Sequence, residues 1–202
     1  CTNHGGMVGT IYLRDAAGNN TNVGVTTFTG DLTIPDKIIH SGDTNTAIRF
    51  PAADTFTVET GGSERLRIDS GGRLLVGTTS AQSVYGNPAV VQIEGTTGAT
   101  STMSLVRHGN SPYLVLGSSG GSSLGAVTAL SSGDRIGQIT FAGADGTDIN
   151  THSASIAAYV DGSVSSNAVP GRIVFATSTG ASEIERLRIT SDGITKFNRY
   201  SG

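Results

Sequence analysis

One short block occurs twice in this chain and limits what the chain can fold into. The first copy is Glu64–Gly72 (ERLRIDSGG) and the second is Glu185–Gly193 (ERLRITSDG). Alternating apolar and charged residues predict a short strand in each copy, with the leucine and isoleucine on one face and the arginines on the other. Each strand then enters a turn whose glycine supplies the positive φ that a chain reversal needs. A block used twice indicates a building unit rather than a reaction centre.

Similar short apolar runs fill most of the remaining sequence. They recur about every 8–12 residues with turn residues between them, which is typical of an all-β array. The small residues of 154–160 leave a strand and a single helical turn both open, and Gly137 predicts a bulge or a close approach to another backbone. The expected strands are 32–34, 37–40, 47–50, 55–59, 65–68 and 74–76, followed by 89–94, 102–107, 113–116, 135–143, 172–177 and 194–197.

These patterns suggest three segments. Residues 1–30, with weak strands at 10–14 and 23–28, read as an N-terminal adapter or as the end of a preceding repeat. Residues 31–80 form a first β repeat unit, and residues 81–202 form a second. The Gly/Ser-rich stretch 117–125 and the stretch 161–171 are expected to be exposed loops.

The apolar content is low for a self-contained core. Hydrophobic residues make up 36% of the 202 positions, aromatic residues 5%, and glycine alone supplies 29 residues. Such a chain either stays disordered or completes its core against other copies. A net charge of only −3 and many Val, Ile and Thr residues favour order. We therefore expect an elongated all-β homotrimer with little or no helix, in which short strands form a β-prism or an intertwined triple β-helix.

The repeated block supplies the expected subunit contacts. In this hypothesis its apolar side chains face a core shared between copies, and its charged side chains pair within one chain or with a neighbouring one. The residues assigned to the subunit interface are Glu64, Arg65, Leu66, Arg67 and Ile68, and Glu185, Arg186, Leu187, Arg188 and Ile189.

The charge pattern argues against some partners. No basic patch exceeds the arginine pair of the repeated block, which disfavours nucleic acid and anionic membranes. No apolar run approaches the roughly 20 residues of a membrane span. The single cysteine, Cys1, excludes an intrachain disulfide framework. Two interpretations of Cys1 are open: the lipid-bearing residue of a lipoprotein, or an internal residue of a longer chain. We favour the second.

Catalytic and metal-binding motifs are weak. The four histidines are scattered without a His-x-His pair, and Asp145–Asp148 lacks the spacing of a calcium loop, so we expect a turn there, no metal site and no cofactor. The serines of Gly117–Gly121 do not form Gly-x-Ser-x-Gly. Nothing in the sequence pairs the available carboxylates as a glycosidase requires. The expectation is a protein that is not an enzyme. The carboxylates considered are Glu59, Glu64, Asp69, Asp134 and Asp161.

Several of these blocks resemble the repeats of tail fibres from tailed bacteriophages, in particular phages of marine bacteria and cyanobacteria. In the first half the similar residues are Ala47–Val58, Glu64–Gly72 and Val76–Thr79. In the second half they are Gly137–Gly143, Pro170–Phe175 and Glu185–Gly193, which resemble the distal repeat of such fibres.

The resemblance implies a trimeric, elongated virion appendage outside the cell. It would contact other tail proteins and attach to a glycan or protein receptor on the host surface. Many such fibres end in a self-cleaving chaperone domain, which we expect to have been removed, to lie outside this sequence or to be absent from this fibre. The alternatives left open are a bacterial surface adhesin or lipoprotein with an extended β fold, and a polysaccharide depolymerase.

Overall fold

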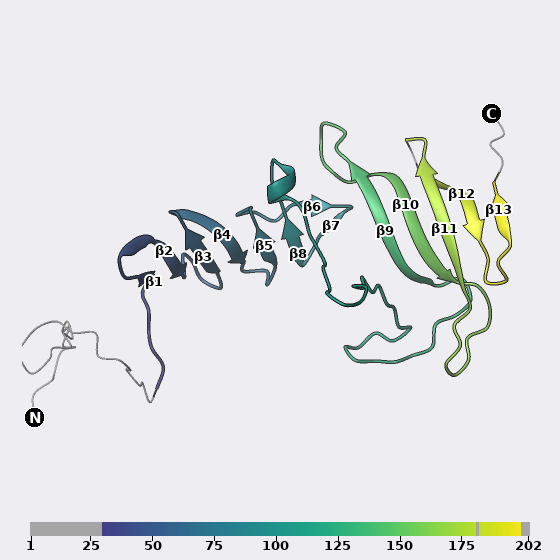
Figure 1. Ribbon diagram of the computed structural model, residues 1–202, viewed down its shortest axis with the longest axis horizontal. Coiled ribbons are helices and arrows are strands. Elements are labelled where there is room, and N and C mark those ends of the chain that lie inside the picture. Colours follow the sequence, from purple (N-terminus) through teal and green to yellow (C-terminus); the bar gives the residue numbers. More distant parts are fainter. Residues whose placement is uncertain (1–29, 181, 199–202) are drawn as a thin grey trace, which may run out of the picture.

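The computed structural model describes residues 30–180 and 182–198, and two β-sheets follow one another along its long axis (Figure 1). Within these residues there is no α-helix, only one turn of 3-10 helix, η1, at Gly98–Thr100. This confirms the predicted all-β class. The first sheet contains β1 (Lys37–His40), β2 (Asp43–Arg49), β3 (Phe56–Thr60), β4 (Ser63–Ile68), β5 (Leu74–Val76) and β8 (Val91–Ile93). The second contains β9 (Arg135–Gly143), β10 (Thr151–Val160), β11 (Gly171–Ser178), β12 (Glu183–Ile189) and β13 (Thr195–Phe197).

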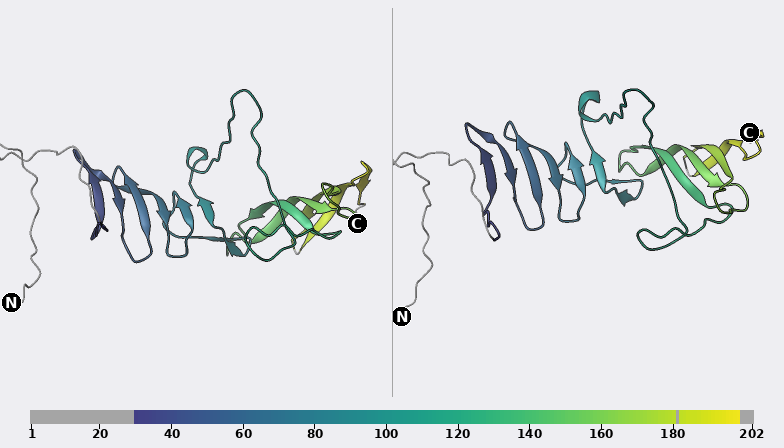
Figure 2. Two further views of the ribbon diagram at one scale, coloured as in Figure 1. Left: turned by 90° about the horizontal axis from the view of Figure 1, so that it is seen from below. Right: turned by 60° about the horizontal axis from the view of Figure 1, so that its bottom comes forward.

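Both sheets are up-and-down meanders. Strands β1 to β5 pair with their sequence neighbours in antiparallel fashion, and so do β9 to β13. Strand β8 extends the first sheet by pairing parallel to β5. A small hairpin of β6 (Ser83–Val84) and β7 (Asn87–Pro88) lies between the two sheets. In the first sheet the strands run across the long axis and are stacked along it (Figure 2).

The two copies of the repeated block fold alike, and each contains a β-bulge. In β4, Leu66 is opposite Val58 while Glu64 is opposite Glu59, so Arg65 is the extra residue. In β12, Leu187 is opposite Phe175 and Glu185 is opposite Ala176, so Arg186 is the extra residue. A bulge of this kind shifts the alternation of side chains by one position. The glutamate and the second arginine, three residues apart, therefore reach the same face.

The turns after the two strands also match the prediction. Gly72 has φ 74° and Gly193 has φ 82°, the left-handed region in which glycine carries no steric cost. After each turn the next segment of the chain bonds to the bulge residue. The Gly77 N–H donates to the Arg65 carbonyl at 3.2 Å, and the Asn198 N–H donates to the Arg186 carbonyl at 3.0 Å.

Few side chains are buried, because each sheet is a single layer. The buried apolar residues are small or medium in size, and they sit in the middle strands of the two sheets. They are Ala47, Leu75, Ala157, Val160 and Val174. The low apolar content of the sequence thus corresponds to a chain that encloses almost no core of its own.

Three predicted strands are wrong, and one open question is resolved. Residues 32–34, 102–107 and 113–116 form no strand, because no neighbouring strand pairs with them in the described chain. Residues 154–160 lie in β10 rather than in a helical turn. Next to Gly137 the register skips Ile136, which confirms the bulge. The expectations for Cys1, 10–14 and 23–28 lie outside the described residues.

Candidate assembly interface

An unbroken row of apolar side chains crosses the second sheet. Strand register places these residues directly opposite one another on adjacent strands, so they share one face. A parallel row on the same face contains Gly137, Ala158, Ile173 and Ile189. The first row consists of Ile139, Ile156, Phe175, Leu187 and Phe197, one from each strand.

The first sheet carries an equivalent row. It joins one apolar residue from each of its six strands, namely Ile38, Ile48, Val58, Leu66, Val76 and Ile93. Phe56, Ile68, Leu74 and Val91 form a second row on the same side. We call the side of each sheet that carries these rows its apolar face. Since the strands of the first sheet are stacked along the long axis, its rows run along that axis (Figure 2).

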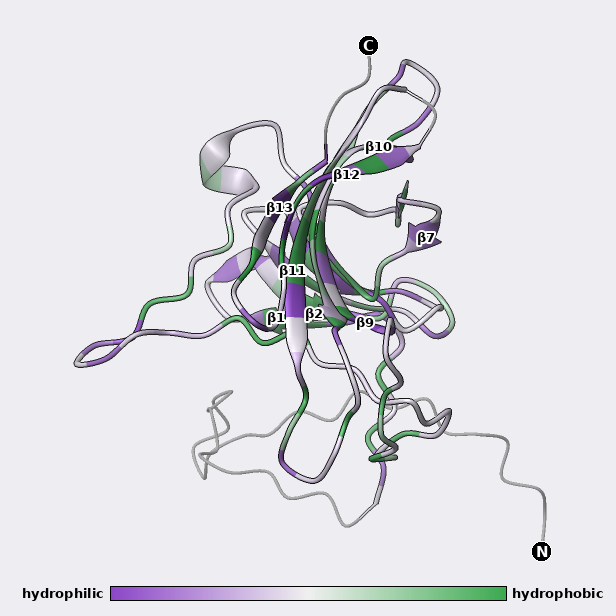
Figure 3. Cartoon of the chain, turned by 90° about the vertical axis from the view of Figure 1, so that its right-hand side faces the viewer, coloured by the Kyte–Doolittle hydropathy of each residue, from purple (hydrophilic) through white to green (hydrophobic). Residues whose placement is uncertain are grey.

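Most of each apolar face is not covered within the described residues. Ile139 is 45% exposed, Ile48 40% and Phe197 78%, and Leu116 lies beside Gly137 at the edge of the second sheet. Viewed along the long axis, hydrophobic and hydrophilic residues alternate along the strands (Figure 3). Soluble monomers rarely expose large continuous apolar patches, so these faces are candidates for contact with other chains.

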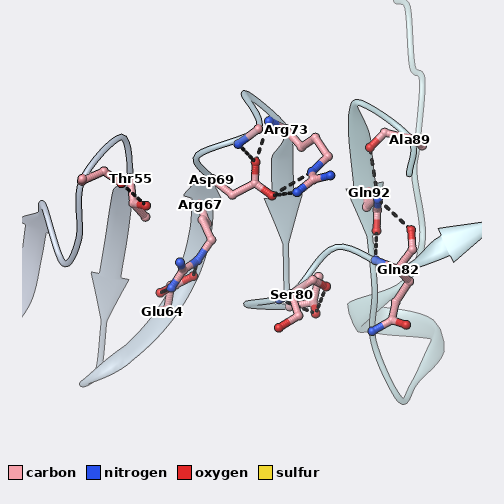
Figure 4. A network of polar contacts seen from close by, with 12 residues as sticks. Thr55, Glu64, Arg67, Asp69, Arg73, Ser80, Gln82, Ala89 and Gln92 are labelled. Carbon is pink, nitrogen blue, oxygen red and sulfur yellow. Dashed lines mark hydrogen bonds and ion pairs between the residues drawn. The ribbon is translucent and has the colours of Figure 1, made fainter. Parts of the chain in front are cut away.

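The opposite faces are polar and are organised by the repeated block. The Arg67 guanidinium donates twice to the Glu64 carboxylate, at 2.7 Å in both bonds (Figure 4). Arg188 and Glu185 form the same two-bond pair at 2.9 and 2.6 Å. In each pair the carboxylate raises the pKa of the arginine above its ordinary value. Arg67 stands opposite the buried Leu75, and Arg188 stands opposite the buried Val174, each on the neighbouring strand.

The first arginine of each block has a different partner. At the bulge, Arg65 Nε donates to the Thr60 hydroxyl at 3.1 Å and Arg186 Nε donates to the Thr177 hydroxyl at 2.9 Å. Both threonines belong to the preceding strand of the hairpin. The two arginines of each block therefore act separately: one fixes the bulge to the neighbouring strand, and the other neutralises a glutamate.

Arg65 and Arg186 lie at the bulges, and the structure separates the other eight predicted interface residues into two groups. Leu66, Ile68, Leu187 and Ile189 lie on the apolar faces, as the alternation predicted, with Ile68 43% and Ile189 38% exposed. Glu64, Arg67, Glu185 and Arg188 lie on the polar faces and pair within one chain. Contact of either group with another copy stays a prediction. Sequence analysis did not predict the bulge. Residues three apart in a regular strand lie on opposite faces, so a glutamate and an arginine at that spacing can share a face only if the strand contains a bulge.

The β6–β7 hairpin attaches to the second sheet. Tyr85 stacks on His152 with 3.7 Å between ring centroids, and the Gly86 N–H donates to the Asn150 side-chain oxygen at 2.8 Å. Ile149, which precedes Asn150 in the sequence, forms a parallel β-bridge with Val84. These contacts join the end of the first sheet to the start of β10.

Each of the five carboxylates considered for catalysis has a structural hydrogen-bond partner. Glu59 and Glu64 stand opposite one another on β3 and β4, a pairing that the sequence did not reveal, but Glu59 accepts from Arg49 at 3.3 Å while Glu64 is bound by Arg67. The predicted turn at Asp145 is confirmed, since its carboxylate accepts from the Thr147 N–H at 2.8 Å. That bond is the main reason why the pKa of Asp145 is lowered.

Across the described residues, no three His, Cys, Asp or Glu side chains gather in a way that would hold a metal ion. Nor does that part of the chain contain a helix of the length and apolarity needed to cross a membrane.

Comparison with known proteins finds similarity in structure only. No family model and no curated protein matches the sequence. The carboxy-terminal domain of the bacteriophage T5 L-shaped tail fibre matches 98% of this chain and 89% of its own length, with a TM-score of 0.59 and 16% identity. The same domain solved together with its intra-molecular chaperone domain has a TM-score of 0.60 and 16% identity, and 61% of that longer chain is matched. The resemblance to tail fibres is thus confirmed at the level of the fold.

Proposed function

We propose that this chain is a subunit of a homotrimeric tail fibre of a tailed phage, in which the apolar faces of three copies pack around a common axis. One observation carries the proposal: both sheets present an uncovered row of apolar side chains, and the rows of the first sheet follow the long axis. The fold shared with a phage tail-fibre domain supports the same assignment.

Packing around an axis accounts for the composition of the chain. Burying one Ile, Leu or Phe side chain contributes roughly 1.5–3 kcal/mol, and each sheet offers several that the chain itself leaves open. Rotational symmetry brings each row against its own copies, so a single stripe per chain is sufficient for a complete core. The resemblance to tail fibres favours three copies, and the polar faces, with their paired glutamates and arginines, then face outward.

The proposed role is mechanical and adhesive rather than catalytic. Stacked sheets form a stiff extracellular rod on the virion, joined to other tail proteins, and exposed loops contact a glycan or protein receptor on the host. The loops 117–125 and 161–171 are the ones we assign to receptor contact, because binding residues concentrate on loops that a rigid scaffold positions.

Gold-labelled antibodies against the protein test this proposal on electron micrographs of the phage that encodes it. We expect gold on fibres attached to the tail, and we expect soluble protein to reduce adsorption of the phage to host cells. Gold on the bacterial surface in uninfected cells would instead support the adhesin alternative. Release of oligosaccharides from host capsule or lipopolysaccharide by the protein would support the depolymerase.

A further inference from the structure

The stretch between the two sheets contains a long apolar segment that nothing covers. Every residue from 101 to 120 is exposed. Seven of them carry large apolar side chains, which are Met103, Leu105, Val106, Tyr113, Leu114, Val115 and Leu116. After η1 the chain leaves the first sheet in a long excursion and only then returns to β9 (Figure 2). We call residues 102–116 the arm.

The backbone of the arm has almost no partners. Apart from the Thr102 hydroxyl bonding to Gly98 and the Ser111 N–H bonding to the Asn110 side chain, the described chain forms no hydrogen bond with residues 102–116. Backbone N–H and C=O groups in folded proteins are paired with protein or water. An extended segment with exposed apolar side chains and open backbone groups has the properties of a strand that lacks its neighbour.

The sequence of the arm is that of two strands joined by a turn. In 102–105 the apolar Met103 and Leu105 alternate with the polar Thr102 and Ser104, as in a strand with one buried face. The run Tyr113–Leu116 is apolar throughout, as in a strand buried on both sides. The link His108–Pro112 contains Gly109, which has φ 81° and permits a reversal.

A strand edge of suitable length is free. Strand β9, nine residues long, is the last strand of its sheet, and among the described residues it pairs only with β10. The arm of the same chain is near this strand, because a Cβ on Gly137 would lie 2.7 Å from the Cβ of Leu116. Despite this proximity, the arm does not pair with β9 within the described residues, although Leu116 lies against the sheet beside Gly137.

We propose that the arm crosses to a neighbouring copy of this chain. Residues 102–107 add a strand to the free edge of the neighbour's β9, and Tyr113–Leu116 lies between the apolar faces of the donor and the neighbour. Pairing at a sheet edge satisfies the open backbone groups of both partners at once. In a closed ring each copy donates one arm and receives one, so no edge of this kind is left over. This inference rests on the proposed trimer.

Site-specific photo-cross-linking tests the exchange in the whole chain. A benzophenone amino acid replaces Leu105 in one variant and the loop residue Ser123 in a control, and only samples that sediment as trimers are irradiated. We expect covalent dimers and trimers on denaturing gels from the Leu105 variant, with the cross-linked peptide containing residues 135–143, and few from the control. Cross-links confined to one chain in an intact trimer would overturn the exchange, whereas absence of a trimer would overturn the proposed function itself.

Leu105→Asp provides an independent check. Leu105 is 49% exposed in the single chain, so the substitution should leave the circular dichroism of each subunit unchanged. Loss of its burial in the assembly should raise the dissociation constant of the trimer at least about tenfold. The control is Asn110→Asp in the link, for which we expect no change. Equal dissociation constants for the two variants would contradict the exchange.

Discussion

At the scale of single residues, charged side chains stabilise each repeated block from within one chain. The bulge at Arg65 and Arg186 brings a glutamate and an arginine three positions apart onto one face, and each pair forms two parallel hydrogen bonds. Two-bond pairs of this geometry contribute more than isolated surface pairs. The charged part of the block therefore shapes the subunit, while its apolar part remains available to other copies.

Glu185→Gln tests the contribution of the pair. The substitution leaves Arg188 without a charged acceptor, and we expect the free energy of unfolding to fall by about 1 kcal/mol in a urea titration. Glu94→Gln is the matched control, since the Glu94 side chain is exposed and makes no hydrogen bond within the described residues. An equal effect of the two substitutions would show that the pair is not stabilising.

We expect Asp161 to make the stability of the subunit sensitive to acid. The Ser191 N–H and the Arg172 guanidinium both donate to Asp161, and they hold its pKa below the ordinary value. A lowered pKa contributes stability above the pKa of the unfolded chain, and this contribution is lost as the pH falls through the folded value. We expect the melting temperature to drop below about pH 4 and Asp161→Asn to reduce that drop.

The control for acid sensitivity is Asp54→Asn, because the Asp54 carboxylate makes no hydrogen bond with the described chain. The Asp54 variant should follow the wild-type pH profile. A wild-type profile for the Asp161 variant as well would contradict the assigned role.

At the scale of strands, sequence patterns predicted most strands whose partner lies in the same chain, but they missed the short hairpin of β6 and β7. Strand β9 has the predicted bounds, Arg135–Gly143. The ends of β10 to β13 lie within a few residues of the predicted ends. The same pattern failed for 102–107 and 113–116. Alternation encodes which face is buried but not what covers it, so a strand without an intrachain partner looks the same in sequence.

The turn after the second copy of the repeated block depends on a glycine with positive φ. Gly193 has φ 82°, and Ala in that conformation costs roughly 1–2 kcal/mol, so Gly193→Ala should lower stability by about that amount. Gly98→Ala is the control, since an added Cβ there meets open space and the backbone does not require positive φ. Thermal unfolding of both variants measures the difference, and a stable Gly193 variant would exclude the turn geometry described above.

At the scale of the whole molecule, the described chain consists mainly of two single-layer sheets, and each sheet has a largely exposed apolar face. Low apolar content predicted this incompleteness, but the rows themselves depend on register, which the sequence did not provide. The bulges decide which residues align across the sheet.

Ile139→Asp tests the apolar face directly. The side chain is 45% exposed in one chain, so each subunit should still fold, while a carboxylate buried among apolar side chains in the assembly should prevent association. Ser122→Asp in the exposed Gly/Ser loop is the control and should remain associated. Size-exclusion chromatography distinguishes the two, and an associated Ile139 variant would place the interface elsewhere.

Sedimentation equilibrium of the purified full chain tests the central claim most directly. We expect a single species of three times the 20.5 kDa chain mass, unchanged over a wide range of protein concentration. A folded monomer, or a dimer formed by two apolar faces, would contradict the trimeric fibre.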